Sequence, residues 1–115
     1  MYKLTYAEIM DSDPAQARAN ERIALDQAIG LMKSADGKDH RSPETRKAVE
    51  HVQKLWAYFI ENLSDPNNEL SESLKKDLIS IGLWAIAEAD RVLADPGRSF
   101  AALIDVNKTI RDGLA

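Results

Sequence analysis

The sequence predicts an all-α fold, namely a small bundle of about four helices with an N-terminal extension. Three observations favour this fold. Helix start and stop signals enclose four segments, apolar residues recur in those segments with helical spacing, and no stretch alternates long enough to indicate a strand. A chain of 115 residues has room for one compact domain, so we expect residues 1–115 to form one.

The first helix is expected over about residues 14–35. Asp13 stands before Pro14, which places a capping carboxylate ahead of a proline at the first helical position. The backbone N–H that proline lacks would have no partner within the helix at that position. Gly37 follows the segment and is typical of a helix end.

The second helix is expected over about residues 43–64 and begins with the same pairing, Ser42 before Pro43. Its apolar residues share one side at about 100° per residue, and Trp56 lies near the middle of that side. We therefore expect Trp56 to be a core residue.

The third helix is expected over about residues 72–94, after the capping residue Ser71. Its apolar side chains spread over an arc that is too broad for one partner, so we expect this helix to sit centrally and to touch at least two neighbours. Gly82 lies within that arc, where it costs about 1 kcal/mol relative to alanine. We expect the close approach of another backbone to compensate for that cost.

The fourth helix is expected over about residues 100–112, with Ser99 as its start signal and Gly113 near its end. Asn107 interrupts its apolar side and needs hydrogen-bond partners if it is buried. Short connections between the successive helices favour antiparallel neighbours.

The composition narrows the range of functions. The chain carries 15 Lys and Arg against 19 Asp and Glu, a net charge of -4, and a general nucleic-acid binder would instead display a basic face. The longest mostly apolar stretch, residues 78–87, is half of the ~20 residues that cross a bilayer, so no membrane insertion is expected. Because the N-terminus lacks the apolar core of a signal peptide, the expected compartment is the cytoplasm.

The sequence offers no recognisable catalytic, metal or cofactor site. It has no cysteine, and His40 and His51 lie outside any zinc motif and are interpreted as solvated histidines. Glu88 and Asp90 point to different sides of the third helix, so they cannot form an acid–base pair by themselves. We therefore expect a protein that is not an enzyme and that holds no cofactor.

Trp84 is the strongest candidate for contact with a partner. On a helical projection it lies away from the main apolar side, on a stripe with polar residues such as Glu88 and Arg91. A large indole in that position is covered either by another segment of this chain or by a partner. Leu83 and Ile23 also lie off the main apolar sides of their helices and would extend an interaction patch.

Tyr2 and Tyr6 belong to the apolar N-terminal extension, together with Leu4 and Ile9. The extension has two interpretations. It packs across the bundle and closes one end, or it is a detachable arm that partly masks a groove until a partner peptide arrives. Tyr2 and Tyr6 therefore join Ile23, Leu83 and Trp84 as candidate partner-binding residues.

Several segments together resemble the FlaF family of flagellar biosynthesis regulators of alphaproteobacteria. They are Tyr6-Ala7-Glu8, the run Glu21-Arg22-Ile23-Ala24-Leu25-Asp26-Gln27-Ala28-Ile29, the run Leu78-Ile79-Ser80-Ile81-Gly82-Leu83-Trp84 leading into Glu88-Ala89-Asp90-Arg91, and the ending Ile110-Arg111-Asp112-Gly113-Leu114. The resemblance extends over essentially the whole chain, and the third run is its most specific part.

The resemblance implies a cytoplasmic protein that is needed for flagellin production and filament assembly. The FlaF family is linked to FlbT, which acts on flagellin messenger RNA, and its members are implicated as flagellin-binding secretion chaperones. The terminal segments of flagellin are apolar and form amphipathic helices. We therefore hypothesise that the bundle receives such a segment in a groove and prevents premature polymerisation.

Two alternatives stay open. In the first, the protein is an adaptor in post-transcriptional control of flagellin mRNA that acts with FlbT, with or without direct RNA contact. Arg46, Lys47 and Lys54 would supply a local basic patch for such contact, against the acidic balance of the chain. In the second, the protein is a structural adaptor that forms a homodimer through Trp84 and Leu83.

Overall fold

A computed structural model gives the structure of the protein, and it describes residues 14–113. The described residues form four α-helices and no strand: α2 (Pro14–Ala35), α3 (Pro43–Leu63), α4 (Glu72–Ala94) and α5 (Ala101–Asp112). The predicted all-helical class is confirmed, and each predicted helix end agrees with the structure to within one residue. The predicted N-terminal extension and the predicted cap Asp13 lie outside the described residues.

Serine caps begin two of the helices, as the sequence predicts. The Ser42 hydroxyl accepts a hydrogen bond of 3.1 Å from the Thr45 backbone N–H at the start of α3. The Ser71 hydroxyl accepts one of 3.2 Å from the Leu74 backbone N–H at the start of α4. Each bond satisfies a backbone donor that has no partner within its helix, and this fixes where the helix starts.

The start of α5 differs from the prediction. Phe100, rather than Ser99, occupies the capping position, and no side chain caps the helix. The Ser99 hydroxyl instead accepts a hydrogen bond of 3.2 Å from the Ala101 backbone N–H, two residues along. The predicted end of the first helix is confirmed, because Gly37 follows α2 with a φ of 85°, a backbone conformation that glycine adopts without steric cost.

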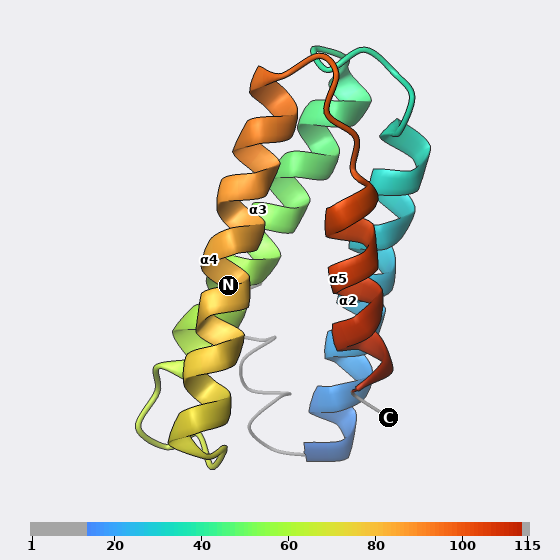
Figure 1. The fold of residues 1–115 in the computed structure, drawn as a ribbon. Coiled ribbons are helices and arrows are strands. Elements are labelled where there is room, and N and C mark those ends of the chain that lie inside the picture. Colours follow the sequence, from blue (N-terminus) through green and yellow to red (C-terminus); the bar gives the residue numbers. More distant parts are fainter. Residues whose placement is uncertain (1–13, 114–115) are drawn as a thin grey trace.

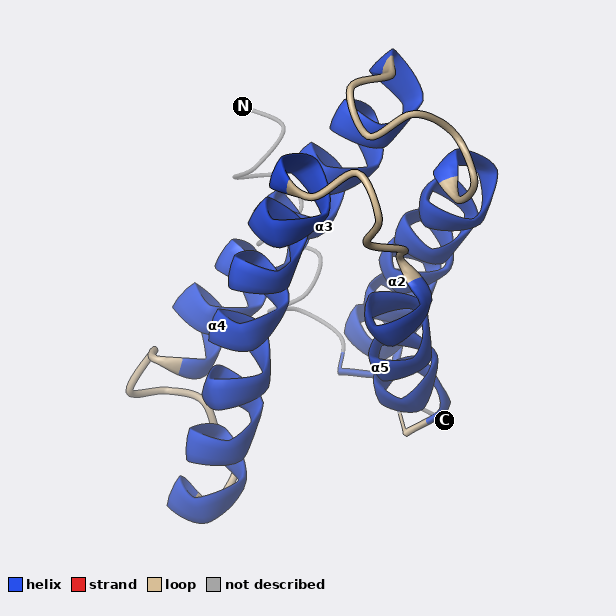
Figure 2. Ribbon diagram, turned by 45° about the horizontal axis from the view of Figure 1, so that its top comes forward, coloured by secondary structure: helices blue, strands red, loops and turns tan. Residues whose placement is uncertain are grey.

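The helices are arranged as two pairs. α3 lies beside α4 and α5 lies beside α2, and both Figure 1 and Figure 2 show the two pairs side by side. α3 also packs on α2, whereas α4 meets α5 over only a short stretch. The prediction that the third helix touches two neighbours is confirmed, since α4 contacts both α3 and α5. The prediction that it is central is wrong, because α3 has the more extensive contacts. A broad apolar arc shows how much apolar surface a helix carries, but not which helix covers it.

Trp56 and Asn107 meet in the core, where α3 faces α5. Trp56 is 1% exposed, which confirms the prediction that it is a core residue, and Asn107 is fully buried. The Trp56 Nε1–H donates a hydrogen bond of 3.1 Å to Asn107 Oδ1, and Asn107 Nδ2 donates one of 2.7 Å to the Leu103 carbonyl. The buried Asn107 amide therefore has the hydrogen-bond partners that we expected it to need in a buried position.

Gly82 lies where α4 packs closely on α3. A β-carbon at this position would stand 3.0 Å from atoms of the Ile60 and Trp56 side chains. The close approach that we expected is therefore made by two side chains of α3, and not by its backbone. Their packing compensates for the low helix propensity of glycine.

Candidate partner-binding groove

A groove of about 460 Å³ lies between α4 and α5, where the two helices separate. Its lining residues are Ser80, Ile81 and Trp84 of α4 and Asp105, Val106, Thr109 and Ile110 of α5. The four apolar side chains are half-buried, and the three polar ones are exposed. The groove therefore has an apolar interior and a polar rim, which is the pattern of a surface that binds a partner.

Trp84 forms part of the α4 wall of this groove. The fully buried face of α4 contains Gly82, Ala85, Ala89 and Val92, and Trp84 stands at the edge of that face. Its indole packs against the core on one side and is half-buried. The helical spacing therefore leaves one side of a large aromatic ring available at the groove.

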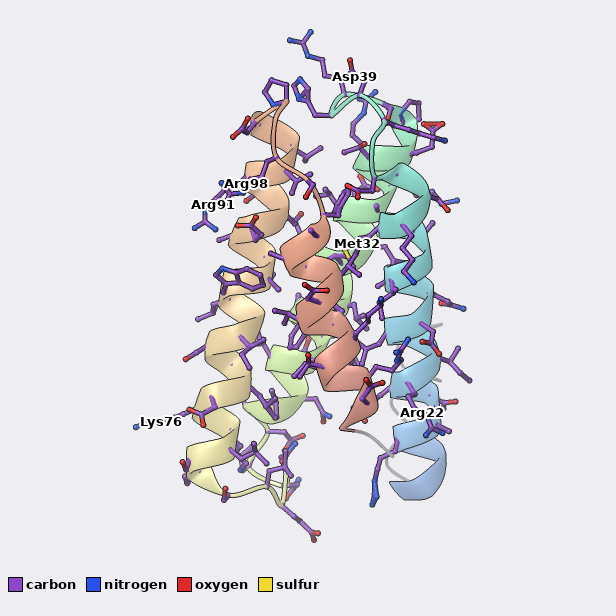
Figure 3. All side chains as sticks on the ribbon, turned by 45° about the vertical axis from the view of Figure 1, so that its right-hand side comes forward. Arg22, Met32, Asp39, Lys76, Arg91 and Arg98 are labelled. Atoms are coloured by element: carbon purple, nitrogen blue, oxygen red, sulfur yellow. The ribbon has the colours of Figure 1, made fainter. Side chains whose placement is uncertain are left out.

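Glu88 follows Trp84 by one helical turn and is 3% exposed. Two arginines bind its carboxylate. Arg98, in the connection between α4 and α5, donates bonds of 2.6 and 3.0 Å, and Arg91 donates one of 3.0 Å. The hydrogen bonds from Arg98 hold the pKa of Glu88 below its ordinary value, although burial acts in the opposite direction. Figure 3 shows Arg91 and Arg98 together beside the upper part of α4.

Helical periodicity does not predict this cluster, because it places Glu88 on a polar stripe of α4. Arg98 comes from a loop, and periodicity assigns no direction to a loop residue. The Glu88–Arg98 bonds fasten the end of α4 to the connection that leads into α5. They therefore help to fix the position at which α5 begins relative to the end of α4, next to the groove.

The structure places the predicted partner-binding residues in different regions. Trp84 lines the groove, whereas Leu83 is 58% exposed and Ile23 is 53% exposed, and neither lines the groove. Ile23 belongs to α2 and is remote in the chain from the groove helices. Tyr2 and Tyr6 lie outside the described residues.

Sequence reasoning missed most of the groove lining. The helical spacing of Ile81, Val106 and Ile110 is typical of core residues and predicts them on the apolar sides of their helices. Residues at buried positions and residues that line a groove have the same apolar character and the same helical spacing. The one available signal was the breadth of the apolar arc on α4, which exceeds what α3 covers.

A second pocket, of about 200 Å³, lies where the α2–α3 and α4–α5 connections meet. Several of its polar groups take part in contacts between loops and helices. Asp36 accepts a hydrogen bond of 3.2 Å from the Phe100 backbone N–H, and the Thr45 hydroxyl donates one of 3.0 Å to the Asp39 carbonyl. These bonds hold the connections and the neighbouring helix ends together at this end of the bundle. The pocket offers few apolar contacts to a partner.

Neither histidine is in the solvated state that the sequence suggested. His40 Nδ1 lies 3.0 Å from the Leu93 carbonyl oxygen at the end of α4, and this contact ties the α2–α3 connection to that helix. His51 Nε2 is buried and has no hydrogen-bond partner. Within the part of the chain that the structure describes, no three side chains among His, Asp and Glu stand close enough to hold a metal ion.

None of the helices described between residues 14 and 113 combines the length and the apolar character that a membrane span requires. The family model for the flagellar protein FlaF matches residues 2–114 of the chain. The search of curated proteins and the search of solved structures returned no match.

Proposed function

The chain belongs to the flagellar protein FlaF family, and from that premise we propose that it is a cytoplasmic secretion chaperone that binds flagellin. In this role it supports flagellin production and filament assembly. The family is one of flagellar proteins and not of enzymes, so the function is sought in a binding surface. The α4–α5 groove is the observation that carries the proposal, because its lining is more apolar than that of the second pocket.

The shape of the groove suits an amphipathic helix. Two helices form its walls, and each wall presents apolar side chains about one turn apart: Ile81 and Trp84 on α4, and Val106 and Ile110 on α5. A third helix that lies along them would bury its own apolar stripe, with residues at i, i+3, i+4 and i+7, as in other helix-in-groove complexes. The terminal segments of flagellin are of this kind.

Binding in the groove would accomplish what export requires of a chaperone. The flagellin segment that drives polymerisation would be covered by the walls of the groove, so that it could not meet another flagellin molecule. The exposed groove residues Ser80, Asp105 and Thr109 would stay at the edge of the complex, where water satisfies them. No covalent chemistry is required, since affinity comes from apolar burial and shape.

Calorimetric titration with purified flagellin from the same bacterium tests the proposal. Trp84→Ala removes the groove indole, and Thr109→Lys places a long cation on the exposed rim without entering the core. We expect each variant to bind at least tenfold more weakly than the wild type, a loss of about 1.4 kcal/mol. Leu83→Ala is the matched control, because Leu83 is next to Trp84 in sequence and lies outside the groove.

The Leu83→Ala protein is expected to keep its affinity within about twofold of the wild type. If flagellin does not bind the wild type, the proposed function is wrong. If flagellin binds and neither groove variant weakens it, the groove is not the site. Because Thr109 is exposed, the Thr109→Lys variant decides the question even if Trp84→Ala does not fold.

A further inference from the structure

The charge along the groove edge of α4 changes sign from one end to the other. Asp77 precedes Trp84 by seven residues and Arg91 follows it by seven, so that all three lie on nearly the same side of the helix. Both charged residues are exposed, and fourteen residues of helix separate them by about 21 Å. The beginning of α4 therefore offers a negative charge beside the groove, and its end offers a positive one.

The positive end is a prepared anion site. Glu88 and Asp95 supply two carboxylates against the two arginines, so the cluster attracts a further anion through its exposed N–H donors and not through a net positive charge. Arg98 uses two of its five N–H donors on Glu88 and Arg91 uses one, and their side chains are 43% and 49% exposed. The buried carboxylate holds both guanidinium groups in place, which lowers the entropy cost of binding a further anion.

We propose that the groove accepts its partner helix in one direction only, parallel to α4, with the C-terminal carboxylate of that helix at Arg91 and Arg98. This inference rests on the proposed function and names the C-terminal helix of flagellin as the bound segment. In this direction the negative end of the helix dipole meets the arginines, and its positive end meets Asp77. The opposite direction places like charges together at both ends.

Cysteine cross-linking tests the direction, since the natural chain contains no cysteine. Ser73→Cys marks the beginning of α4 and Ser99→Cys marks the connection next to Arg98, and both serines are exposed. The probe is a synthetic peptide of about the last 24 residues of flagellin, carrying one cysteine either at its N-terminal end or one turn before its C-terminus. The C-terminal label is expected to couple with Ser99→Cys and the N-terminal label with Ser73→Cys.

Opposite pairing, or equal yields from both labels, overturns the direction while leaving the binding of flagellin intact. Failure of the peptide to bind a protein that does bind whole flagellin overturns the choice of the C-terminal helix. If whole flagellin does not bind either, the proposed function fails, and the inference fails with it. The experiment therefore distinguishes a wrong direction, a wrong flagellin segment and a wrong proposed function.

Amidation of the peptide's C-terminal carboxylate tests the anion site itself. Wild-type protein is expected to bind the peptide with a free C-terminal carboxylate about fivefold more tightly than the C-terminal amide, with a smaller ratio in high salt. Arg91→Gln should abolish this preference, and Glu88 retains its two bonds from Arg98 in that variant. Arg22→Gln is the control, because Arg22 is an exposed arginine on α2, far from Arg91 in Figure 3. Equal binding of acid and amide by the wild type overturns the carboxylate site.

Discussion

The indole N–H of Trp56 on α3 donates a hydrogen bond of 3.1 Å to the side-chain oxygen of Asn107 on α5. Both residues are almost completely buried, and they belong to different helix pairs of the bundle. The bond therefore joins the α3–α4 pair to the α2–α5 pair. It also holds α5 in position, and another side of that helix forms one wall of the groove.

Replacing Asn107 should destabilise the fold. In Asn107→Leu, a side chain of similar size leaves the Trp56 N–H buried without an acceptor, which costs about 1–3 kcal/mol. Urea unfolding, followed by tryptophan fluorescence, measures the change in the free energy of unfolding. Asn67→Ala, at an exposed position in the α3–α4 connection, should change it by less than about 0.5 kcal/mol. An Asn107→Leu protein as stable as the wild type would show that the bond contributes nothing.

Two glycine-to-alanine substitutions should have opposite effects. Gly30→Ala lies on the exposed side of α2 with no atom within 4 Å of the new β-carbon, so helix propensity should stabilise the protein by about 0.5–1 kcal/mol. Gly82→Ala places its β-carbon 3.0 Å from Ile60 and Trp56, and overpacking of about 1–3 kcal/mol should exceed the same propensity gain. Thermal unfolding compares the two. A stabilised Gly82→Ala protein would contradict the close packing of α3 on α4.

Glu88 should make stability depend on pH in the acid range. Its pKa is lowered in the folded protein, chiefly by the hydrogen bonds from Arg98, so the ionised carboxylate stabilises the fold above its unfolded pKa of about 4.3. That contribution is lost as the pH falls through the lower, folded pKa. Glu88→Gln should therefore cost about 1 kcal/mol at pH 7, because the two arginines are half exposed, and nearly nothing at the acid limit.

Urea unfolding at several pH values between 7 and 3 measures this difference. Glu50→Gln, at an exposed position of α3, is the control, and its difference from the wild type should stay small at every pH. A Glu88→Gln protein that differs from the wild type by the same amount at all pH values would exclude the ionised carboxylate as the cause.

The helices themselves could be predicted from local chemistry. Ser42 and Ser71 cap the next turn of backbone, and Gly37 adopts the conformation that ends α2, so each signal acts within a few residues of its own position. Trp56 could be assigned to the core because it stands in the middle of a continuous apolar side. These predictions require no knowledge of which helix is the neighbour.

The assembly of the helices could not be predicted in the same way. The apolar arc of α4 suggested a central helix, whereas part of that arc lines the groove and Leu74 is 44% exposed. Glu88 looked like a surface residue because its partner Arg98 lies in a loop ten residues away. Both errors arise from contacts that depend on where another segment lies, and helical periodicity contains no information about that.

The two tryptophans of the chain provide the most direct test of the account, which is that a partner helix binds between α4 and α5. Each indole N–H gives its own signal in a ¹H–¹⁵N NMR spectrum, and Asn107→Leu, which removes the acceptor of Trp56, assigns the pair. When flagellin is added, the Trp84 signal should shift, whereas the Trp56 signal, from a ring 1% exposed, should stay nearly unchanged. A Trp84 signal that does not move while backbone signals change on the outer face of α2 would contradict the account.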